Sequence, residues 1–189
     1  MVGVLALQGD VAAHAQMLAT LGAAVREVRV PADLEGLDGL VLPGGESTTM
    51  TLGVAREGLG DPLRALAATG VPLLGTCAGL IMLDREHLGI LDVTTQRNAF
   101  GRQIRSFEAD LDLDGITTPE APMRAVFIRA PWVTEHGDDV QVLAAVDGHV
   151  VAVRQDHVIA VSFHPEISGD DRLHAAFMRS VLARHRYLS

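Results

Sequence analysis

The chain has 189 residues, of which 48% are hydrophobic, and its formal net charge is −9. This length suits one well-filled core and is short for two, so we expect a single domain over residues 1–189. The negative charge opposes a phosphate backbone and argues against nucleic acid as a partner. All fifteen basic residues are arginine, and the absence of lysine excludes Schiff-base catalysis and a Walker-type phosphate site.

The sequence also bears on the cellular compartment. A single cysteine excludes an intrachain disulfide, and the first ten residues lack the basic start and cleavage site of a secretory signal. Apolar runs such as Val2 to Leu7 are far shorter than the roughly 20 residues of a membrane span. We therefore expect a soluble, cytoplasmic protein with no membrane partner.

The first half of the chain alternates short apolar strands with helical patterns. Strands are predicted over Val2 to Leu7, Ala24 to Val30, Gly39 to Leu42 and Val71 to Leu74. Helices are predicted over Val11 to Leu21, over Pro62 to Ala68 after an Asp61 N-cap, and over Ala78 to Glu86. This alternation is typical of an α/β fold with a mostly parallel sheet and helices on both faces.

Three motifs follow the ends of predicted strands in this half. Gln8 follows the first strand, Pro43-Gly44-Gly45 follows the third, and Cys77 follows the fourth. Ligands of such sheets bind at the carboxyl ends of the parallel strands. The sequence therefore predicts a ligand site at this edge.

Cys77 lies at the centre of Gly75-Thr76-Cys77-Ala78-Gly79, between an apolar strand and a helical stretch. This is the pattern of a nucleophile elbow, a sharp turn that strains its central residue and needs small residues two places away. A helix N-terminus behind the sulfur favours the reactive thiolate. A lone cysteine after a buried strand is more often an inert core residue. The two flanking glycines make us predict that Cys77 is a nucleophile.

The loop Pro43 to Thr49 contains paired glycines, which let backbone N–H groups turn toward a ligand. We predict that the N–H groups of Gly45 and Ala78 form the oxyanion hole for a tetrahedral intermediate. A Gly-Gly peptide flips at low steric cost, so the hole can remain unformed until something presses on the loop. Taken alone, Pro-Gly-Gly is most often a simple turn.

The second half of the chain changes character. Asp147-Gly148 is a strong two-residue hairpin signal, and the strands around it predict an antiparallel portion of a mixed sheet. The predicted strands are Phe107 to Leu113, Met123 to Arg129, Val140 to Val146, His149 to Arg154 and Val158 to Phe163. A closing amphipathic helix is predicted over Asp170 to Arg186, with an inner side formed by Leu173, Phe177, Val181 and Leu182.

His164-Pro165-Glu166 follows the last predicted strand. If strand geometry continues there, positions i and i+2 point to the same face, so the imidazole and the carboxylate stand side by side. His164 is then a candidate base for Cys77, and Glu166 a candidate for fixing its tautomer. Without the elbow, a histidine at this place usually just caps a loop.

The other seven histidines show no spacing typical of a metal site, and we expect neither a metal nor a cofactor. Most of them should be solvated or lightly packed. His14, on the first helix near Gln8, is expected either to face a partner or simply to be exposed.

The elbow, the Gly-Gly loop and the His-x-Glu motif, in this arrangement, resemble the class I, triad-type glutamine amidotransferases over nearly the whole chain. A narrower set of motifs resembles the glutaminase subunits of pyridoxal 5'-phosphate synthases. These motifs are Val4 to Gly9, Pro43 to Thr49, Gly75 to Gly79, Arg97 to Gln103, Phe127 to Pro131 and Ser162 to Glu166.

The resemblance implies a three-layer, flavodoxin-like fold and the hydrolysis of L-glutamine through a cysteinyl thioester on Cys77. It also implies a separate synthase subunit, assembled as a ring-shaped core, that receives the ammonia and that the glutaminase must dock onto to be fully active. The residues implied to contact the glutamine are Gly45, Glu46, Ser47, Arg97, Ile128 and Arg129.

Two other functions remain open at this point. An elbow-cysteine hydrolase or redox protein of the same broad fold would act without a partner and would not need His164 and Glu166. A catalytically silent subunit would only bind the synthase, but the presence of Cys77, His164 and Glu166 together argues against it.

Overall fold

The computed structural model describes residues 1–97 and 106–188. Within these ranges, nine strands form the main sheet. They are β1 (Val2–Leu5), β2 (Val25–Val28), β3 (Gly39–Leu42), β4 (Leu73–Thr76), β5 (Val93–Gln96), β8 (Trp132–His136), β9 (Gln141–Val146), β10 (His149–Gln155) and β11 (Val158–Val161). Two further strands, β6 (Ser106–Leu111) and β7 (Met123–Ile128), pair with each other in a separate antiparallel sheet.

The helices begin and end as follows: α1 (Val11–Thr20), a 3-10 helix η1 (Pro31–Leu34), α2 (Ser47–Arg56), α3 (Gly60–Ala68), α4 (Ala78–Leu83), α5 (Pro165–Ser168) and α6 (Arg172–Leu188). None of the helices within the described ranges combines the length and the apolar character that a bilayer-spanning segment needs.

The main sheet runs in the order β2-β1-β3-β4-β11-β10-β8-β5, with β9 paired to β10. The pairings of β1 with β2 and β3, and of β4 with β3 and β11, are parallel. The pairings of β10 with β11, β8 and β9, and of β5 with β8, are antiparallel. The prediction of a mixed, mostly parallel sheet is confirmed, and the carboxyl ends of β1, β3, β4 and β11 lie along one edge.

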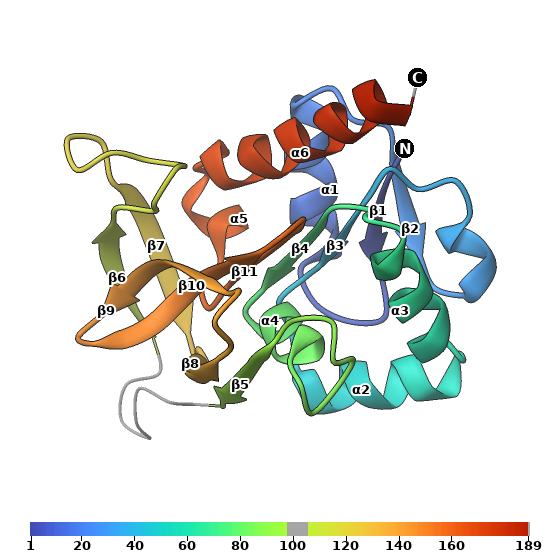
Figure 1. Cartoon of the computed structure of the whole chain (residues 1–189), viewed down its shortest axis with the longest axis horizontal. Helices are drawn as coiled ribbons and strands as arrows, with labels where there is room; N and C mark the ends of the chain where they lie inside the picture. Colours follow the sequence, from blue (N-terminus) through green and yellow to red (C-terminus); the bar gives the residue numbers. More distant parts are fainter. Residues whose placement is uncertain (98–105, 189) are drawn as a thin grey trace.

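Each face of the sheet has its own apolar core, because successive side chains of a strand point to opposite faces. In β3, Leu40 and Leu42 pack in one core and Val41 in the other. The first core includes residues of α2, α3 and α4, and the second includes residues of α1, α6 and the β6–β7 pair. Figure 1 shows how the helices and the β6–β7 pair are placed about the sheet, with β6 and β7 beside β9 and β10.

The Asp147-Gly148 hairpin is present between β9 and β10. Both residues have positive φ, 48° and 81°, as a type I′ turn requires.

Several predicted elements differ from the structure. Helix α2 was not predicted, and its first residues fall in the predicted loop Pro43 to Thr49. Strands β5 and β8 and the short helix α5 were not predicted either. Leu59 occupies the N-cap position of helix α3 without a capping hydrogen bond from its side chain, and Asp61 lies in the first turn, so the predicted Asp61 cap was wrong. Helix α4 ends at Leu83 because Asp84 has extended backbone. Leu182 is 55% exposed, since it lies one position beyond the Leu173, Phe177, Val181 repeat that faces the core.

Candidate active site

Cys77 lies at the turn between β4 and α4, with φ 48° and ψ −105°, a conformation that few non-glycine residues adopt. Its backbone N–H donates to the Val161 carbonyl at 2.8 Å. A Cβ atom on Gly79 would lie 2.0 Å from the Leu42 carbonyl oxygen, and one on Gly75 would lie 2.9 Å from the backbone of Gly79. The main chain therefore packs around Cys77 as a nucleophile elbow requires.

His164 and Glu166 come from the turn after β11. The Nδ1 atom of His164 lies 2.7 Å from Oε1 of Glu166. The ring also interacts electrostatically with Cys77, whose Sγ lies 3.8 Å from the Ile128 carbonyl oxygen. Strand geometry does not continue here, contrary to the sequence-based argument. His164 is the N-cap of α5, and Pro165 places Glu166 in the first turn of that helix. The two side chains meet through a helix start instead of a strand.

The electrostatic surroundings favour the imidazolium form of His164. Burial alone lowers the pKa of this ring, but its interactions with Cys77 and with Glu166 raise it to about 10. The side chain of Glu166 has no exposed surface and the side chain of His164 is 7% exposed. Glu166 and His164 thus form a buried pair directly beside Cys77, which lines the cavity described below.

The loop after β3 packs directly against these residues. A Cβ atom on Gly44 would lie 2.5 Å from Cε1 of His164 and 3.4 Å from Cβ of Cys77. The Glu46 N–H donates to Oε1 of Gln8 at 2.6 Å, so the loop after β1 holds this loop in place. Gly45 has φ 156° and, like Ala78, lines the cavity beside Cys77. Their role as oxyanion donors remains a prediction.

A cavity of about 520 Å³ opens above Cys77 and His164. Every residue that the family resemblance assigned to glutamine binding lines this cavity: Gly45, Glu46, Ser47, Arg97, Ile128 and Arg129. Glu166 lies behind His164 and does not line the cavity. The sequence argument did not include Asp10, Ile81 and Ile167 among the site residues, although Asp10 follows the end of β1 and could have been found from that position.

The polar groups of this cavity are engaged with one another. The carboxylate of Glu46 caps α2 by accepting from the Thr49 N–H at 2.7 Å and the Thr48 N–H at 3.1 Å. These hydrogen bonds lower the pKa of Glu46 to about 2, so it is anionic at neutral pH. Arg97 donates to Oγ of Ser47 at 3.4 Å and to Oγ1 of Thr48 at 3.2 Å. Residues 98–103 of the predicted arginine motif lie outside the described residues.

Backbone strain also points to this cavity. Four described residues other than glycine have positive φ. Two of them, Asp147 and Asp156, lie in hairpin turns, where this is ordinary. The other two, Cys77 and Arg129, line the cavity, with φ 48° and 45°. Strain of this kind persists where the surrounding structure enforces it, often at functional sites.

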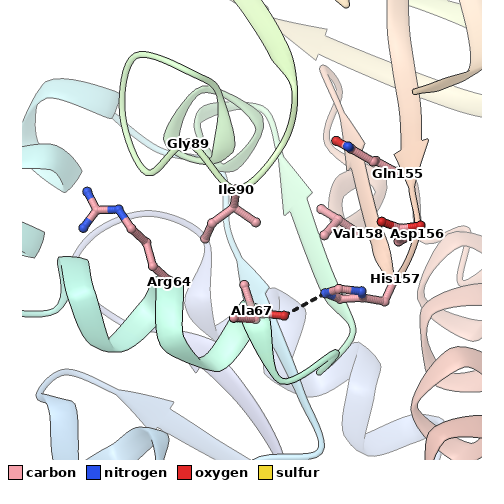
Figure 2. Close-up of a pocket in the computed structure, with 9 residues that line it drawn as sticks. Arg64, Ala67, Gly89, Ile90, Gln155, Asp156, His157 and Val158 are labelled. Carbon is pink, nitrogen blue, oxygen red and sulfur yellow. Dashed lines mark hydrogen bonds between the residues drawn. The ribbon is translucent and has the colours of Figure 1, made fainter. Parts of the chain in front are cut away.

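A second cavity, of about 300 Å³, lies at the opposite end of the sheet, beside the turn between β10 and β11 (Figure 2). Nε2 of His157 lies 3.0 Å from the Ala67 carbonyl, and Arg64 donates to the Leu88 carbonyl at 2.9 Å. Gln155 accepts from the backbone of Asp92. These polar groups join segments of the fold, and none of them is a nucleophile paired with a base.

Two of the seven other histidines, most of which were expected to be solvated or lightly packed, are fully buried. His14 and His174 have no exposed area, and Nδ1 of His14 lies 2.8 Å from Nε2 of His174. The expectation of a solvated or partner-facing His14 was therefore wrong. His14 and Leu18, four residues apart, share the inner face of α1, and this spacing was the available signal.

This pair should make the fold sensitive to acid. Burial and the neighbouring histidines lower the pKa of His14 to about 3, and burial lowers the pKa of His174 to about 4, whereas both are near 6.5 in an unfolded chain. Below pH 6.5 the unfolded chain therefore binds more protons, and the stability present above that pH is lost as the pH falls. Each ring adds up to about 1.4 kcal/mol per pH unit. His164, whose pKa is raised to about 10 in the folded chain, contributes a slope of the opposite sign around pH 6.5, and this contribution vanishes only well below that pH, where both states hold the ring protonated. It is common to the wild type and His174→Gln, so it cancels when their slopes are compared.

Urea unfolding between about pH 7 and about pH 5 measures this effect as the change in the free energy of unfolding. The variant His174→Gln should flatten the slope, and the exposed-site control His136→Gln should leave it unchanged. Equal slopes in the wild type and His174→Gln would contradict the assigned pKa shift.

Comparison with known proteins gives a consistent result. Residues 4–183 match the family model described as the SNO glutamine amidotransferase family. The pyridoxal 5'-phosphate synthase subunit PdxT of Rhodococcus opacus is 52% identical over 94% of this chain and 95% of that protein. The subunit of the same name from Acidothermus cellulolyticus is 52% identical over 98% of this chain and 95% of its own.

Solved structures agree with this. A crystal structure of a glutamine amidotransferase is 44% identical, with a TM-score of 0.88, and the match covers 95% of this chain and 98% of that one. PurLQS from Thermotoga maritima is 19% identical with a TM-score of 0.73, covering all of this chain and 98% of that one, which supports the fold alone.

Proposed function

Since this chain belongs to the SNO glutamine amidotransferase family, we propose that it hydrolyses L-glutamine to L-glutamate and ammonia as the glutaminase subunit of a pyridoxal 5'-phosphate synthase. The observation that carries the proposal is that Cys77 and His164 lie together at one cavity, with Glu166 2.7 Å from His164 on the side away from it. A nucleophile, a base and an orienting carboxylate in this geometry are the parts that acyl transfer needs.

The reaction proceeds in two halves. The Cys77 thiolate attacks the side-chain carboxamide carbon of glutamine, and the oxygen gains negative charge that the N–H groups of Gly45 and Ala78 stabilise. The C–N bond then breaks, and ammonia leaves with a proton from His164. A glutamyl thioester remains on the sulfur. Water, deprotonated by His164, attacks the thioester carbon, and the C–S bond breaks to release glutamate and the thiolate.

The cavity suits a zwitterionic amino acid. Its volume of about 520 Å³ lies within the range of small-molecule sites. The guanidinium groups of Arg97 and Arg129 offer donors for a carboxylate, and the anionic Glu46 offers an opposite charge for an ammonium. These residues, with Gly45, Ser47 and Ile128, form the proposed glutamine site.

A separate synthase subunit completes the activity. The chain has no lysine and cannot form a Schiff base with a sugar substrate, so the ammonia must be consumed on another chain. The relatives named above are described as subunits of a synthase, which supports a hetero-oligomer. We place the complex in the cytoplasm, and we propose that residues 1–189 form one amidotransferase domain.

The proposed function predicts that glutaminase activity depends on the partner. Ammonia release from L-glutamine should be low for the isolated chain and rise when the purified synthase subunit is added, because docking presses the Gly44-Gly45 loop into its donor conformation. A coupled assay for glutamate and ammonia measures both conditions, with the synthase subunit alone as the control. Activity that is absent in the mixture, or unchanged by the partner, would refute the proposal.

A further inference from the structure

One carboxylate oxygen of Glu166 forms no hydrogen bond with the other two proposed catalytic residues, Cys77 and His164. Oε1 of Glu166 lies 2.7 Å from His164, but Oε2 is buried and forms no hydrogen bond with any residue in the described ranges. Nε2 of His14 lies 3.4 Å from this oxygen and 3.2 Å from Oγ1 of Thr76. An unpaired oxygen on a buried carboxylate is costly, so the protonation state of His14 matters.

The proton positions in this cluster follow from its contacts. Both His14 and His174 have lowered pKa values, so each ring is neutral and carries one N–H. A single proton lies between Nδ1 of His14 and Nε2 of His174, which are 2.8 Å apart. If His14 donated it, Nε2 of His14 would turn a lone pair toward the carboxylate, and a buried N–H on Nδ1 of His174 would have no acceptor.

The opposite assignment satisfies the cluster better. If His174 donates its Nε2–H to Nδ1 of His14, then Nε2 of His14 carries the other proton and points it toward Thr76 and Oε2 of Glu166. The only unpaired atom of His174 is then the Nδ1 acceptor, and an unpaired buried acceptor is tolerated better than an unpaired donor. The carboxylate gains a donor on the side opposite His164.

We infer that His14 is a positioning residue of the active site, whose Nε2–H, directed by His174, holds the second carboxylate oxygen of Glu166 while the first holds His164. The inference rests on the proposed glutaminase function. With Nε2–H of His14 3.4 Å from one oxygen and His164 2.7 Å from the other, rotation of the carboxylate away from His164 is opposed, and its negative charge is stabilised in a buried position. His14 does not line the glutamine cavity, so it acts on the rate of the chemistry and not on substrate binding.

Two substitutions of His14 distinguish this positioning role from a purely structural one, in which the ring only fills volume in the core. His14→Leu keeps a similar apolar volume and removes the donor. Glutaminase kcat in the complex with the synthase subunit should fall about tenfold to a hundredfold, with KM unchanged. This is the size of effect seen when a residue that orients a metal ligand by a hydrogen bond is removed. His14→Gln can place an amide N–H near the same point and should recover most of the lost kcat.

A matched control and a second readout keep the test decisive. Leu18→Ala damages the same buried face of α1 one turn away, and it should lower the melting temperature without lowering kcat. The rate of Cys77 alkylation by iodoacetamide reports the sulfur–imidazole pair without glutamine, and it should fall in His14→Leu and recover in His14→Gln. A wild-type complex that does not hydrolyse glutamine would refute the proposed function, while the alkylation rates would still test His14.

The inference is overturned if folded His14→Leu keeps the wild-type kcat and alkylation rate, or if folded His14→Gln is as slow as His14→Leu. If His14→Leu does not fold, His174→Leu takes its place. This variant leaves His14 without its directing donor and should lower kcat with KM unchanged, and an unchanged kcat would overturn the inference.

Discussion

Cys77→Ala should abolish glutamine hydrolysis by the complex while leaving the complex itself intact. Removal of the sulfur removes the only nucleophile at the elbow among the described residues, and the expected loss in kcat is on the order of 10⁴-fold or more. The fold should survive, because alanine and cysteine have the same Cβ and tolerate the φ of 48° equally. Glutamate release by the wild-type and variant complexes measures the effect.

Size-exclusion chromatography of Cys77→Ala with the synthase subunit is the control, and it should show the same elution as the wild type. The variant should also fail to form a covalent adduct with a glutamine-derived electrophile, as judged by the mass of the intact protein. Substantial turnover by an intact Cys77→Ala complex would mean that another group attacks the carboxamide.

His164→Asn should have an effect of similar size for a different reason. Asparagine can still donate to Glu166, but it cannot take up a proton, so nothing protonates the leaving ammonia or activates water. We expect kcat to fall on the order of 10⁴-fold. The thiolate also loses the imidazolium, whose pKa the structure raises to about 10, so labelling by the electrophile should slow as well.

The labelling rate decides whether His164 has this role. Equal labelling of His164→Asn and wild type, with both proteins folded by circular dichroism, would remove His164 from the mechanism. A variant of an exposed histidine elsewhere, His136→Asn, should label at the wild-type rate.

The parallel half of the sheet could be predicted from the sequence because its strands are buried on both faces. Such strands are short, continuous apolar runs, as in β1 and β3. The strands β5 and β8 were missed because they alternate weakly and carry exposed polar residues such as Thr134 and Glu135. Helix α2 was missed because it starts with Ser47-Thr48-Thr49, residues of low helix propensity, and depends on the Glu46 cap.

The site itself was predicted with mixed success. The elbow is a local motif, so its geometry around Cys77 followed from its spacing of small residues. The pairing of His164 with Glu166 was expected on a strand, but it depends on the start of α5. This helix has only four residues, too few for a helical pattern to be recognised in the sequence. The burial of His14 was missed although its spacing from Leu18 indicated it, because the partner that accepts a buried imidazole there, His174, lies 160 positions away in the chain.

The close packing around Gly44, Gly75 and Gly79 has a consequence for how this active site tolerates change. At each of the three positions, one added methyl carbon would meet either main-chain atoms or the His164 ring within 3 Å. The catalytic edge is therefore built with its backbone segments in contact and has no spare volume between them. A substitution at any of these three glycines should therefore distort the site as surely as the loss of Cys77, His164 or Glu166 would remove its chemistry.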